Sequence, residues 1–157
     1  MLKIVGMADM KVSGADGDIL VTYALGSCVG LTIYDRVAGV GGMLHAMMPD
    51  SSIDPNKSKE NPFMFIDTGL IKLIDGCVRM GAKKERLEIK AAGCSALKTS
   101  GFFKIGYRNF NSLTSALSGL NLALQAYDVG GKSSRTMRLM ISDGEVLVED
   151  GGKKIKL

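Results

Sequence analysis

Three β-rich runs separated by short turns constrain the fold of this chain more than any other feature. They cover residues 19–24, 29–34 and 40–45. Gly26-Ser27 separates the first run from the second, and Asp35-Arg36 begins the turn between the second and third. Because strands joined by short turns pair with their chain neighbours, we expect a meander that returns His45, at the end of the third run, to the position beside the second.

Cys28 and His45 are the candidate reactive pair. His45 is the only histidine in the chain, and imidazole is the side chain whose unperturbed pKa lies near neutral pH. A cysteine nucleophile usually needs such a base to take its proton. Cys28 follows a glycine-containing turn, where the backbone can approach a ligand closely and N–H groups can point outward. The pattern therefore indicates a nucleophile at a strand edge.

Thr22, Ser27 and Val29 complete the expected site. The Thr22 hydroxyl, six residues before Cys28, is a candidate to hydrogen-bond the second imidazole nitrogen and fix its tautomer, the third role in a triad. Backbone N–H groups around Cys28, at Ser27 and Val29, are the expected donors to an oxyanion. The alternative is that the cysteine and histidine do no chemistry, since free cysteine is among the most buried residue types.

A series of short motifs gives the chain a resemblance to a known family. In chain order they are Thr22 with Leu25-Gly26-Ser27-Cys28-Val29, Asp35, His45 with Pro49, Asp67-Thr68, Met80-Gly81-Ala82, Ile105-Gly106 with Arg108-Asn109, and Asp128 with Gly130-Gly131 and Arg135. Their order and spacing resemble the CheD family, the chemoreceptor glutamine deamidases of bacterial and archaeal chemotaxis, over nearly the whole chain. The resemblance implies a triad of Cys28, His45 and Thr22.

The same resemblance implies a fold, a reaction and partners. The fold would be α+β, a mostly antiparallel β-sandwich flanked by helices and similar to the catalytic domain of cytotoxic necrotizing factor deamidases. The reaction would convert glutamine side chains of methyl-accepting chemoreceptors to glutamate, without a metal or organic cofactor, and hydrolysis of glutamyl methyl esters is a permitted side activity. CheD proteins also dock onto the phosphatase CheC, so a regulatory binding module is the alternative function. A generic hydrolase of small amides would instead act on free glutamine.

The chain departs from the family pattern at two places. Met64-Phe65-Ile66 stands where the family tends to have a basic residue and a tyrosine before the helix aspartate, and Gly93-Cys94-Ser95 stands where it has Gly-Gly-Ala. Neither change touches the triad. We expect both to bear on substrate fit or partner docking.

Composition and charge favour a globular protein with protein partners. The 157 residues, 46% hydrophobic and 23% charged, suit one domain over residues 1–157 that buries about two-thirds of its unfolded surface. The N-terminus lacks a signal-peptide core and no apolar run reaches the ~18 residues of a membrane span, so we expect a cytoplasmic protein without membrane insertion. The net charge of +4 is scattered and no nucleic-acid-binding motif is present, so we expect acidic protein helices rather than nucleic acid as partners.

The three cysteines, at positions 28, 77 and 94, form no closely spaced pair. This spacing argues against a disulfide scaffold and makes a Cys₃His zinc site the less favoured alternative. Cys77 falls on the apolar stripe of a predicted helix. Cys94 lies in a loop of small residues, where we expect a packed thiol.

The rest of the pattern predicts two helices and further strands. One helix covers residues 63–80 and ends at Gly81; the other runs from an N-cap at Asn109 to about Leu120. Further strands are expected at residues 3–5, 87–92, 122–127, 136–142, 145–149 and, at an edge, 153–157, with Asp143-Gly144 as a hairpin turn. Irregular segments are expected at residues 13–18 and 93–101. The polar segment 50–62 is a predicted loop, either covering the site or a tolerated insertion.

Overall fold

The computed structural model describes residues 1–96 and 104–157. The strands in these two ranges are β1 (Leu2–Ile4), β2 (Asp9–Ser13), β3 (Ile19–Leu25), β4 (Val29–Asp35), β5 (Val40–Ala46), β6 (Leu87–Gly93), β7 (Ala126–Val129), β8 (Arg135–Met140), β9 (Val146–Asp150) and β10 (Lys153–Lys156). The α-helices are α1 (Pro55–Glu60), α2 (Ile66–Arg79) and α3 (Ile105–Gly119), and short 3-10 helices lie at Ser51–Ile53, Pro62–Met64 and Lys84–Arg86.

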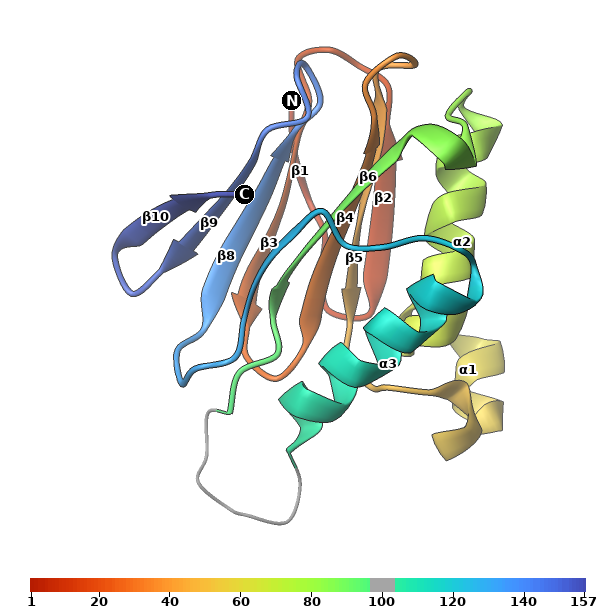
Figure 1. Ribbon diagram of the computed structural model, residues 1–157, viewed down its shortest axis with the longest axis vertical. Coiled ribbons are helices and arrows are strands. Elements are labelled where there is room, and N and C mark those ends of the chain that lie inside the picture. Colours follow the sequence, from red (N-terminus) through yellow and green to blue (C-terminus); the bar gives the residue numbers. More distant parts are fainter. Residues whose placement is uncertain (97–103) are drawn as a thin grey trace.

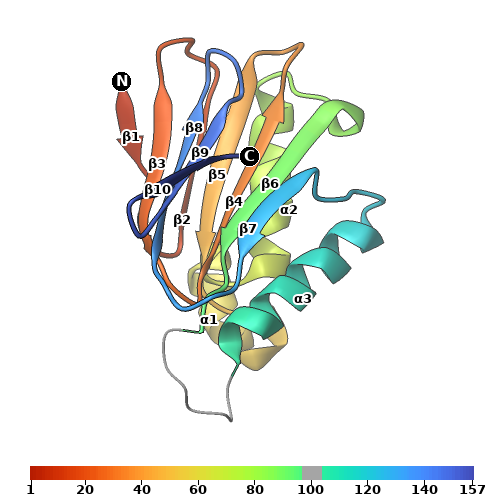
Figure 2. The same ribbon diagram turned by 60° about the vertical axis from the view of Figure 1, so that its left-hand side comes forward.

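The strands of the described residues form two five-stranded sheets. Sheet A has the order β1-β3-β8-β9-β10 and sheet B the order β2-β5-β4-β6-β7. β1 pairs with β3 and β6 with β7 in parallel, and the other pairings are antiparallel. The sheets face each other, and α2 and α3 cover the outer face of sheet B (Figures 1 and 2). The predicted α+β, sheet-rich class is therefore confirmed.

Two apolar cores follow from this layering. The inner core lies between the sheets and joins residues such as Leu20, Leu139 and Val148 of sheet A to Tyr34 and Met43 of sheet B. The outer core lies between sheet B and the helices and includes the buried apolar stripe of α2. Sheet B is buried on both faces, which explains why every residue of β4 and β5 is buried.

Helix α2 confirms the clearest helix predicted from the sequence. Its buried residues are Ile66, Gly69, Leu70, Leu73, Ile74 and Cys77, at the spacing of one helix face. Gly81 follows the helix with a φ of +107°, as expected of a glycine stop. The predicted start at residue 63 was early, because Pro62–Met64 forms a separate 3-10 turn. No helix in residues 1–96 or 104–157 has both the length and the apolar character needed to cross a membrane.

The predicted meander is correct for β4 and β5 and wrong for β3. Strands β4 and β5 are antiparallel neighbours in sheet B, whereas β3 lies in sheet A between β1 and β8. The chain crosses from one sheet to the other at Gly26-Ser27. A short break thus marks a change of sheet here, which alternation of apolar residues cannot distinguish from a hairpin.

Several predicted boundaries need correction. The segment predicted as a loop, 50–62, contains α1 and a 3-10 helix, whose N-caps are the side chains of Asp54 and Asp50. Strand β2 was missed, because its polar residues hide the pattern of an edge strand. The strand predicted at 122–127 is the shorter β7, Ala126–Val129. Residues 97–101 of the predicted irregular segment after β6 lie outside the described part of the chain.

The Asp143-Gly144 turn and the edge strand at the end of the chain are confirmed. The turn joins β8 to β9, and Gly144 has a φ of +76°. Strand β10 pairs with β9 at the edge of sheet A.

Candidate active site

Cys28 lies at one end of the sandwich, in the turn that carries the chain from β3 to β4. The end of β6, the start of α3 and the connection from β7 to β8 gather at the same end (Figure 1). Cys28 is partly exposed and packs against the inner core, whereas Cys77 and Cys94 are buried. A substrate can therefore reach the Cys28 thiol more readily than the other two.

Strand register brings His45 to the same face of sheet B as Cys28. His45 lies directly opposite Gly30 in the β4–β5 pair, so these two residues share a face. Cys28 precedes Gly30 by two residues and shares that face in an extended chain. Diagonal neighbours of this kind are about 7 Å apart. Gly30 adds no side chain between the thiol and the imidazole, and a β-carbon there would lie 2.7 Å from Leu25 Cδ1.

The Thr22 hydroxyl fixes the tautomer of His45. Thr22 Oγ1 lies 2.7 Å from His45 Nδ1 and 2.8 Å from the backbone oxygen of Val5. The carbonyl can only accept, so the single hydroxyl proton goes to Val5 and Thr22 must accept from Nδ1–H. The neutral imidazole then carries its lone pair on Nε2. Among residues 1–96 and 104–157 that buried atom has no hydrogen-bond partner, which leaves it free to act as a base.

Burial keeps both members of the pair neutral in the resting protein. It lowers the pKa of His45 below the ordinary 6.5. Burial also raises the pKa of Cys28 above the ordinary 9.0, an effect that the Cys28 backbone N–H partly offsets. The pKa values of the buried Cys77 and Cys94 thiols rise further, to about 12. Cys28 is accordingly the most easily ionised of the three thiols.

Three successive carbonyl groups of the turn at residues 26–28, called the cysteine turn below, accept hydrogen bonds from α3 and from the residues that follow β6. Ser95 N–H donates to Gly26 O at 2.8 Å, Asn109 Nδ2 donates to Ser27 O at 2.8 Å, and Cys94 N–H donates to Cys28 O at 2.8 Å. Within the part of the chain that the structure describes, the N–H groups of Ser27 and Cys28 have no backbone acceptor. These two amides are therefore available to a ligand on the side of the turn facing away from those donors.

Val29 is placed differently from Ser27. It is the first residue of β4 and has a neighbour on each side, Ala46 of β5 and Gly93 of β6. An N–H group in a central strand points in the plane of the sheet towards one of those neighbours. Of the two residues predicted to support an oxyanion, Ser27 thus lies in the turn, where it is partly exposed, and Val29 lies in the sheet, where it is buried.

The backbone around the turn adopts unusual conformations. Ala24 and Cys94 have φ values of +57° and +53°, although neither is glycine. The pairing of β3 with β8 also changes register between Thr22 and Leu25. Positive φ values in non-glycine residues and β-bulges both occur preferentially at functional sites. Their concentration on the two sides of Cys28 supports a site here.

An internal network holds the segment behind the cysteine turn. The Arg135 guanidinium, 4% exposed, donates to Asp128 at 3.0 Å, to Ser95 Oγ at 2.7 Å and to Gly93 O at 3.1 Å. Gly93 has a φ of +106°, and a β-carbon at this position would lie 2.4 Å from Cys28 O. The sequence motifs at residues 128–135 therefore support the cysteine turn from β7 and β8, a role that their spacing alone did not reveal.

The two departures from the family pattern lie in different settings. Phe65 is 1% exposed and belongs to the interior. Cys94 is buried in the outer core, whereas Cys28 packs against the inner core; Cys94 is thus the packed thiol that was predicted. Cys77 lies on the buried stripe of α2 as predicted. No group of three or more His, Cys, Asp or Glu side chains in the described residues is arranged to hold a metal ion.

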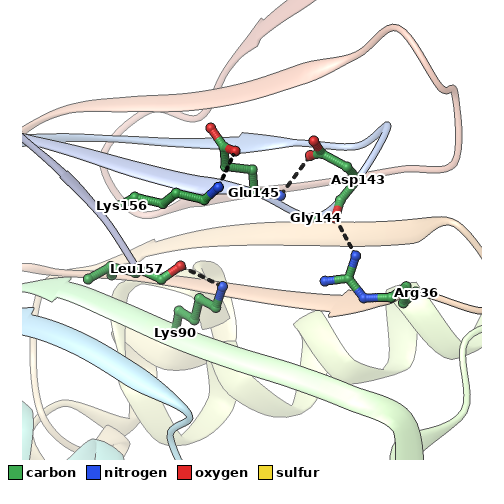
Figure 3. Close-up of a pocket in the computed structure, with 7 residues that line it drawn as sticks. All are labelled: Arg36, Lys90, Asp143, Gly144, Glu145, Lys156 and Leu157. Carbon is green, nitrogen blue, oxygen red and sulfur yellow. Dashed lines mark hydrogen bonds and ion pairs between the residues drawn. The ribbon is translucent and has the colours of Figure 1, made fainter.

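A separate pocket lies towards the other end of β4 (Figure 3). It has a volume of about 240 Å³ and is lined by Arg36, Lys90, Asp143, Gly144, Glu145, Lys156 and Leu157. Its charged side chains pair with one another or with backbone groups, as in the Lys156–Glu145 pair at 2.9 Å. It contains no thiol or imidazole, so the chemistry of a cysteine nucleophile belongs to the Cys28 end.

Comparison with known proteins gives a family. Residues 47–150 match the family model described as CheD chemotactic sensory transduction. A protein of Solibacter usitatus, named probable chemoreceptor glutamine deamidase CheD, is 46% identical over 98% of this chain and 92% of its own length. Similarly named proteins of Syntrophus aciditrophicus and Pyrococcus abyssi are 43% and 40% identical, over 98% and 97% of this chain and 96% and 94% of their own lengths.

Proposed function

Because this chain belongs to the CheD family, we propose that it hydrolyses glutamine side chains of methyl-accepting chemoreceptors to glutamate, with Cys28 as nucleophile, His45 as general base and acid, and Thr22 as the group that orients His45. The names of its relatives support the reaction and the substrate class. The observation that carries the assignment is the bond between Thr22 and His45 Nδ1, together with an Nε2 atom that no described residue hydrogen-bonds.

The first half of the reaction forms a thioester. The thiol proton of Cys28 passes to His45 Nε2, and the sulfur forms a bond to the carboxamide carbon of the substrate. The electron pair of the carbonyl moves onto oxygen, where N–H groups of the cysteine turn stabilise it, by about 3 kcal/mol for each donor. When the C=O bond re-forms, the C–N bond breaks, the nitrogen takes the proton from His45 and ammonia leaves.

The second half regenerates the enzyme. Water gives a proton to Nε2 of His45 and its oxygen forms a bond to the thioester carbon. The C–S bond then breaks, the sulfur recovers the proton from the imidazolium, and the product is a glutamate side chain. The imidazole gains and loses one proton in each half, and the overall reaction consumes water and releases ammonia. No step of this scheme uses a metal or an organic cofactor.

The resting geometry requires one adjustment before the first proton transfer. Sγ of Cys28 and Nε2 of His45 are on one face of sheet B but are not hydrogen-bonded to each other. Hydrogen bonds between a nucleophile and its base often tighten only in the substrate complex. Substrate binding therefore closes the gap, and displaces the water that would otherwise solvate the partly exposed thiol.

The charges around the turn suit an acidic protein surface. Lys104 is the N-cap residue of α3, Arg108 lies in the first turn of α3, and Lys132 lies in the connection from β7 to β8; all three are exposed. Positive charge around a site speeds the approach of an acidic helix. We infer that receptor helices bring the glutamine to Cys28 in a fixed orientation, so free glutamine should be a poor substrate.

The proposed nucleophile is tested by co-expression of the receptors with wild-type protein or with Cys28→Ala. Mass spectrometry of receptor peptides should show glutamate with the wild-type protein and unchanged glutamine with the variant. Cys77→Ala is the matched control, because it removes a buried thiol remote from the turn, and it should leave the modification in place. Unchanged deamidation by Cys28→Ala would rule out the assignment.

The alternative function, docking to a CheC phosphatase, is separated by the same variant. Docking depends on a surface rather than on the sulfur, so Cys28→Ala should still bind CheC. The similarity of the fold to cytotoxic necrotizing factor deamidases and the possible ester hydrolysis stay predictions that rest on the family.

A further inference from the structure

The Asn109 side chain is bonded to the backbone on both sides of the site, beside Cys28 and just beyond His45. It is 0% exposed, and its Nδ2 donates to Ser27 O at 2.8 Å and to Met47 O at 3.1 Å. Ser27 precedes Cys28, and Met47 follows His45 by two residues. We propose that Asn109 is a positioning residue that sets the alignment of Cys28 with His45, a role that rests on the proposed function of that pair.

The sequence of α3 allows this side chain to reach both segments. Gly106 and Asn109 lie three residues apart and so share one face of the helix. A β-carbon at Gly106 would lie 2.4 Å from Cys94 O and 2.7 Å from Ser95 O. Only a glycine lets the helix backbone approach the end of β6 so closely, and this approach places Asn109, one turn later, over the cysteine turn.

The two bonds join segments that have no other side-chain link to each other within the described residues. Ser27 and Cys28 lie in the β3–β4 turn, and Met47 lies just beyond the end of β5. The last paired residues of β4 and β5 are Val29 and Ala46, so neither Ser27 nor Met47 is part of the ladder. The backbone ladder therefore cannot fix the separation of Ser27 and Met47. A single amide nitrogen bonded to both carbonyls does so, because it must remain within hydrogen-bond distance of each.

The other half of the Asn109 amide argues for a role beyond stability. Oδ1 is buried and has no hydrogen-bond partner in the part of the chain that the structure describes, and an unsatisfied buried acceptor is destabilising. An apolar residue of similar volume would avoid that cost. Asparagine is therefore better explained by the two bonds from Nδ2 than by packing, and a residue kept at a cost in stability beside a reactive pair is expected to serve that pair.

The test compares Asn109→Ala and Asn109→Asp with two controls. Asn111→Asp makes the same chemical change at an exposed position of the same helix. Ser112→Ala removes the bond from Ser112 Oγ to Pro49 O and so loosens the helix without touching the cysteine turn. For each variant, kcat and KM for receptor deamidation, the thermal unfolding midpoint and the alkylation rate of Cys28 by iodoacetamide are measured.

Both Asn109 variants should lower kcat by about 10²-fold, the effect expected of a displacement of about 1 Å, with KM changed by less than about twofold. Alkylation of Cys28 should become faster at the same time, because the released turn exposes the sulfur. Asn109→Asp should also acquire a new pH dependence. Its carboxyl group donates to one carbonyl when protonated and repels both when ionised, so its activity relative to the wild type should rise as the pH falls.

Three results would overturn the proposal. The first is a wild-type kcat in a folded Asn109→Ala protein, and the second is an equal loss of kcat in Ser112→Ala. The third is failure of both Asn109 variants to fold while Asn111→Asp folds, since the residue would then hold the fold rather than the site. If only Asn109→Ala fails to fold, the test rests on Asn109→Asp: a relative activity that does not rise as the pH falls would overturn the proposal. Alkylation of Cys28 does not depend on the receptor. If the wild-type protein does not deamidate receptors but the Asn109 variants still change the alkylation rate, the proposed function fails while the positioning role of Asn109 stands.

Discussion

At the scale of single residues, the site depends on where one proton resides. The Thr22 hydroxyl donates to Val5 O and accepts from His45 Nδ1–H, so the lone pair of the neutral ring lies on Nε2, the proposed base. A carboxylate in the position of Thr22 would stabilise an imidazolium more strongly than a hydroxyl does. The hydroxyl instead fixes the tautomer without charging the ring, which agrees with the lowered pKa of His45.

Substitution of Thr22 tests this tautomer assignment. Thr22→Val keeps the shape and removes the hydroxyl, so His45 loses its fixed tautomer and kcat should fall by at least about 10-fold. Thr22→Ser keeps the hydroxyl and should retain most of the activity. Equal activity of the valine and wild-type proteins in the receptor assay would show that the hydroxyl does not orient the base.

The pH dependence of the reaction follows from the neutral resting pair. Protonated His45 cannot accept the thiol proton, and burial lowers its pKa below 6.5. Deamidation should therefore persist at pH 6.5 and decline as the pH falls further. The measurement is kcat/KM between pH 5 and 9, and a decline centred above pH 7 would contradict the assignment.

The resting thiol provides a second, independent measurement. Because burial raises the pKa of Cys28 above 9.0, alkylation of the free protein should increase with a midpoint above pH 9. Peptide mass spectrometry distinguishes Cys28 from Cys77 and Cys94. A midpoint near pH 7 would instead indicate a preformed thiolate–imidazolium pair.

At the scale of elements, the site is made where the ends of several elements meet. β3 supplies Thr22 from sheet A, while β5 supplies His45 from sheet B. The end of β6 and the start of α3 hold the carbonyl groups of the cysteine turn. The proposed triad therefore spans the inner core, and its geometry depends on how the two sheets pack.

Gly93 is the most sensitive point of this arrangement. Gly93→Ala would place a β-carbon 2.4 Å from Cys28 O on a residue whose φ is +106°, so the turn must move and stability should fall by about 3 kcal/mol. Deamidation should be lost with it. Gly39→Ala is the matched control, because its φ is +66° and its β-carbon would meet no atom within 4 Å; it should cost about 1 kcal/mol and leave the reaction unchanged.

At the scale of the whole molecule, a buried carboxylate ties the far end of the sandwich together. Asp35, 0% exposed, accepts hydrogen bonds from the backbone of Val37, Ala38 and Lys83 and from Arg86. Burial raises the pKa of Asp35, but the bonds from Arg86, Lys83 and Ala38 outweigh it and hold that pKa well below its usual range. The ion pair links the β4–β5 hairpin to the start of β6.

Stability should therefore depend on this group at acid pH. A carboxyl group whose pKa is lower in the folded state stabilises the fold above its unfolded pKa, about 3.9, and loses that contribution as the pH falls towards the folded value. Asp35→Ala should lower the free energy of unfolding by about 3 kcal/mol at pH 7 and by less at pH 3. Urea unfolding at the two pH values checks this; equal losses at both would contradict it.

The sequence by itself determined the elements with strong local signals and the residues with distinctive chemistry. The stripe of α2, the glycine after it, the Asp143-Gly144 turn, and the pairing of β4 with β5 follow from periodicity and turn chemistry, which act over a few residues. The single histidine singled out His45 as the one imidazole available to a cysteine. Asn109 looked like a helix cap for the same local reason, although α3 begins at Ile105 and buries it.

Only the tertiary structure decided which sheet holds Thr22, what Asn109 binds and which carbonyl groups are held behind Cys28. β3 and β4 are joined by a break that reads equally well as a hairpin or as a crossing between sheets. The choice depends on pairing with β8, more than a hundred residues later in the sequence, and on the burial of both faces of sheet B. Contacts between residues so far apart leave no periodic signal in the chain, because they are fixed by packing rather than by local propensity.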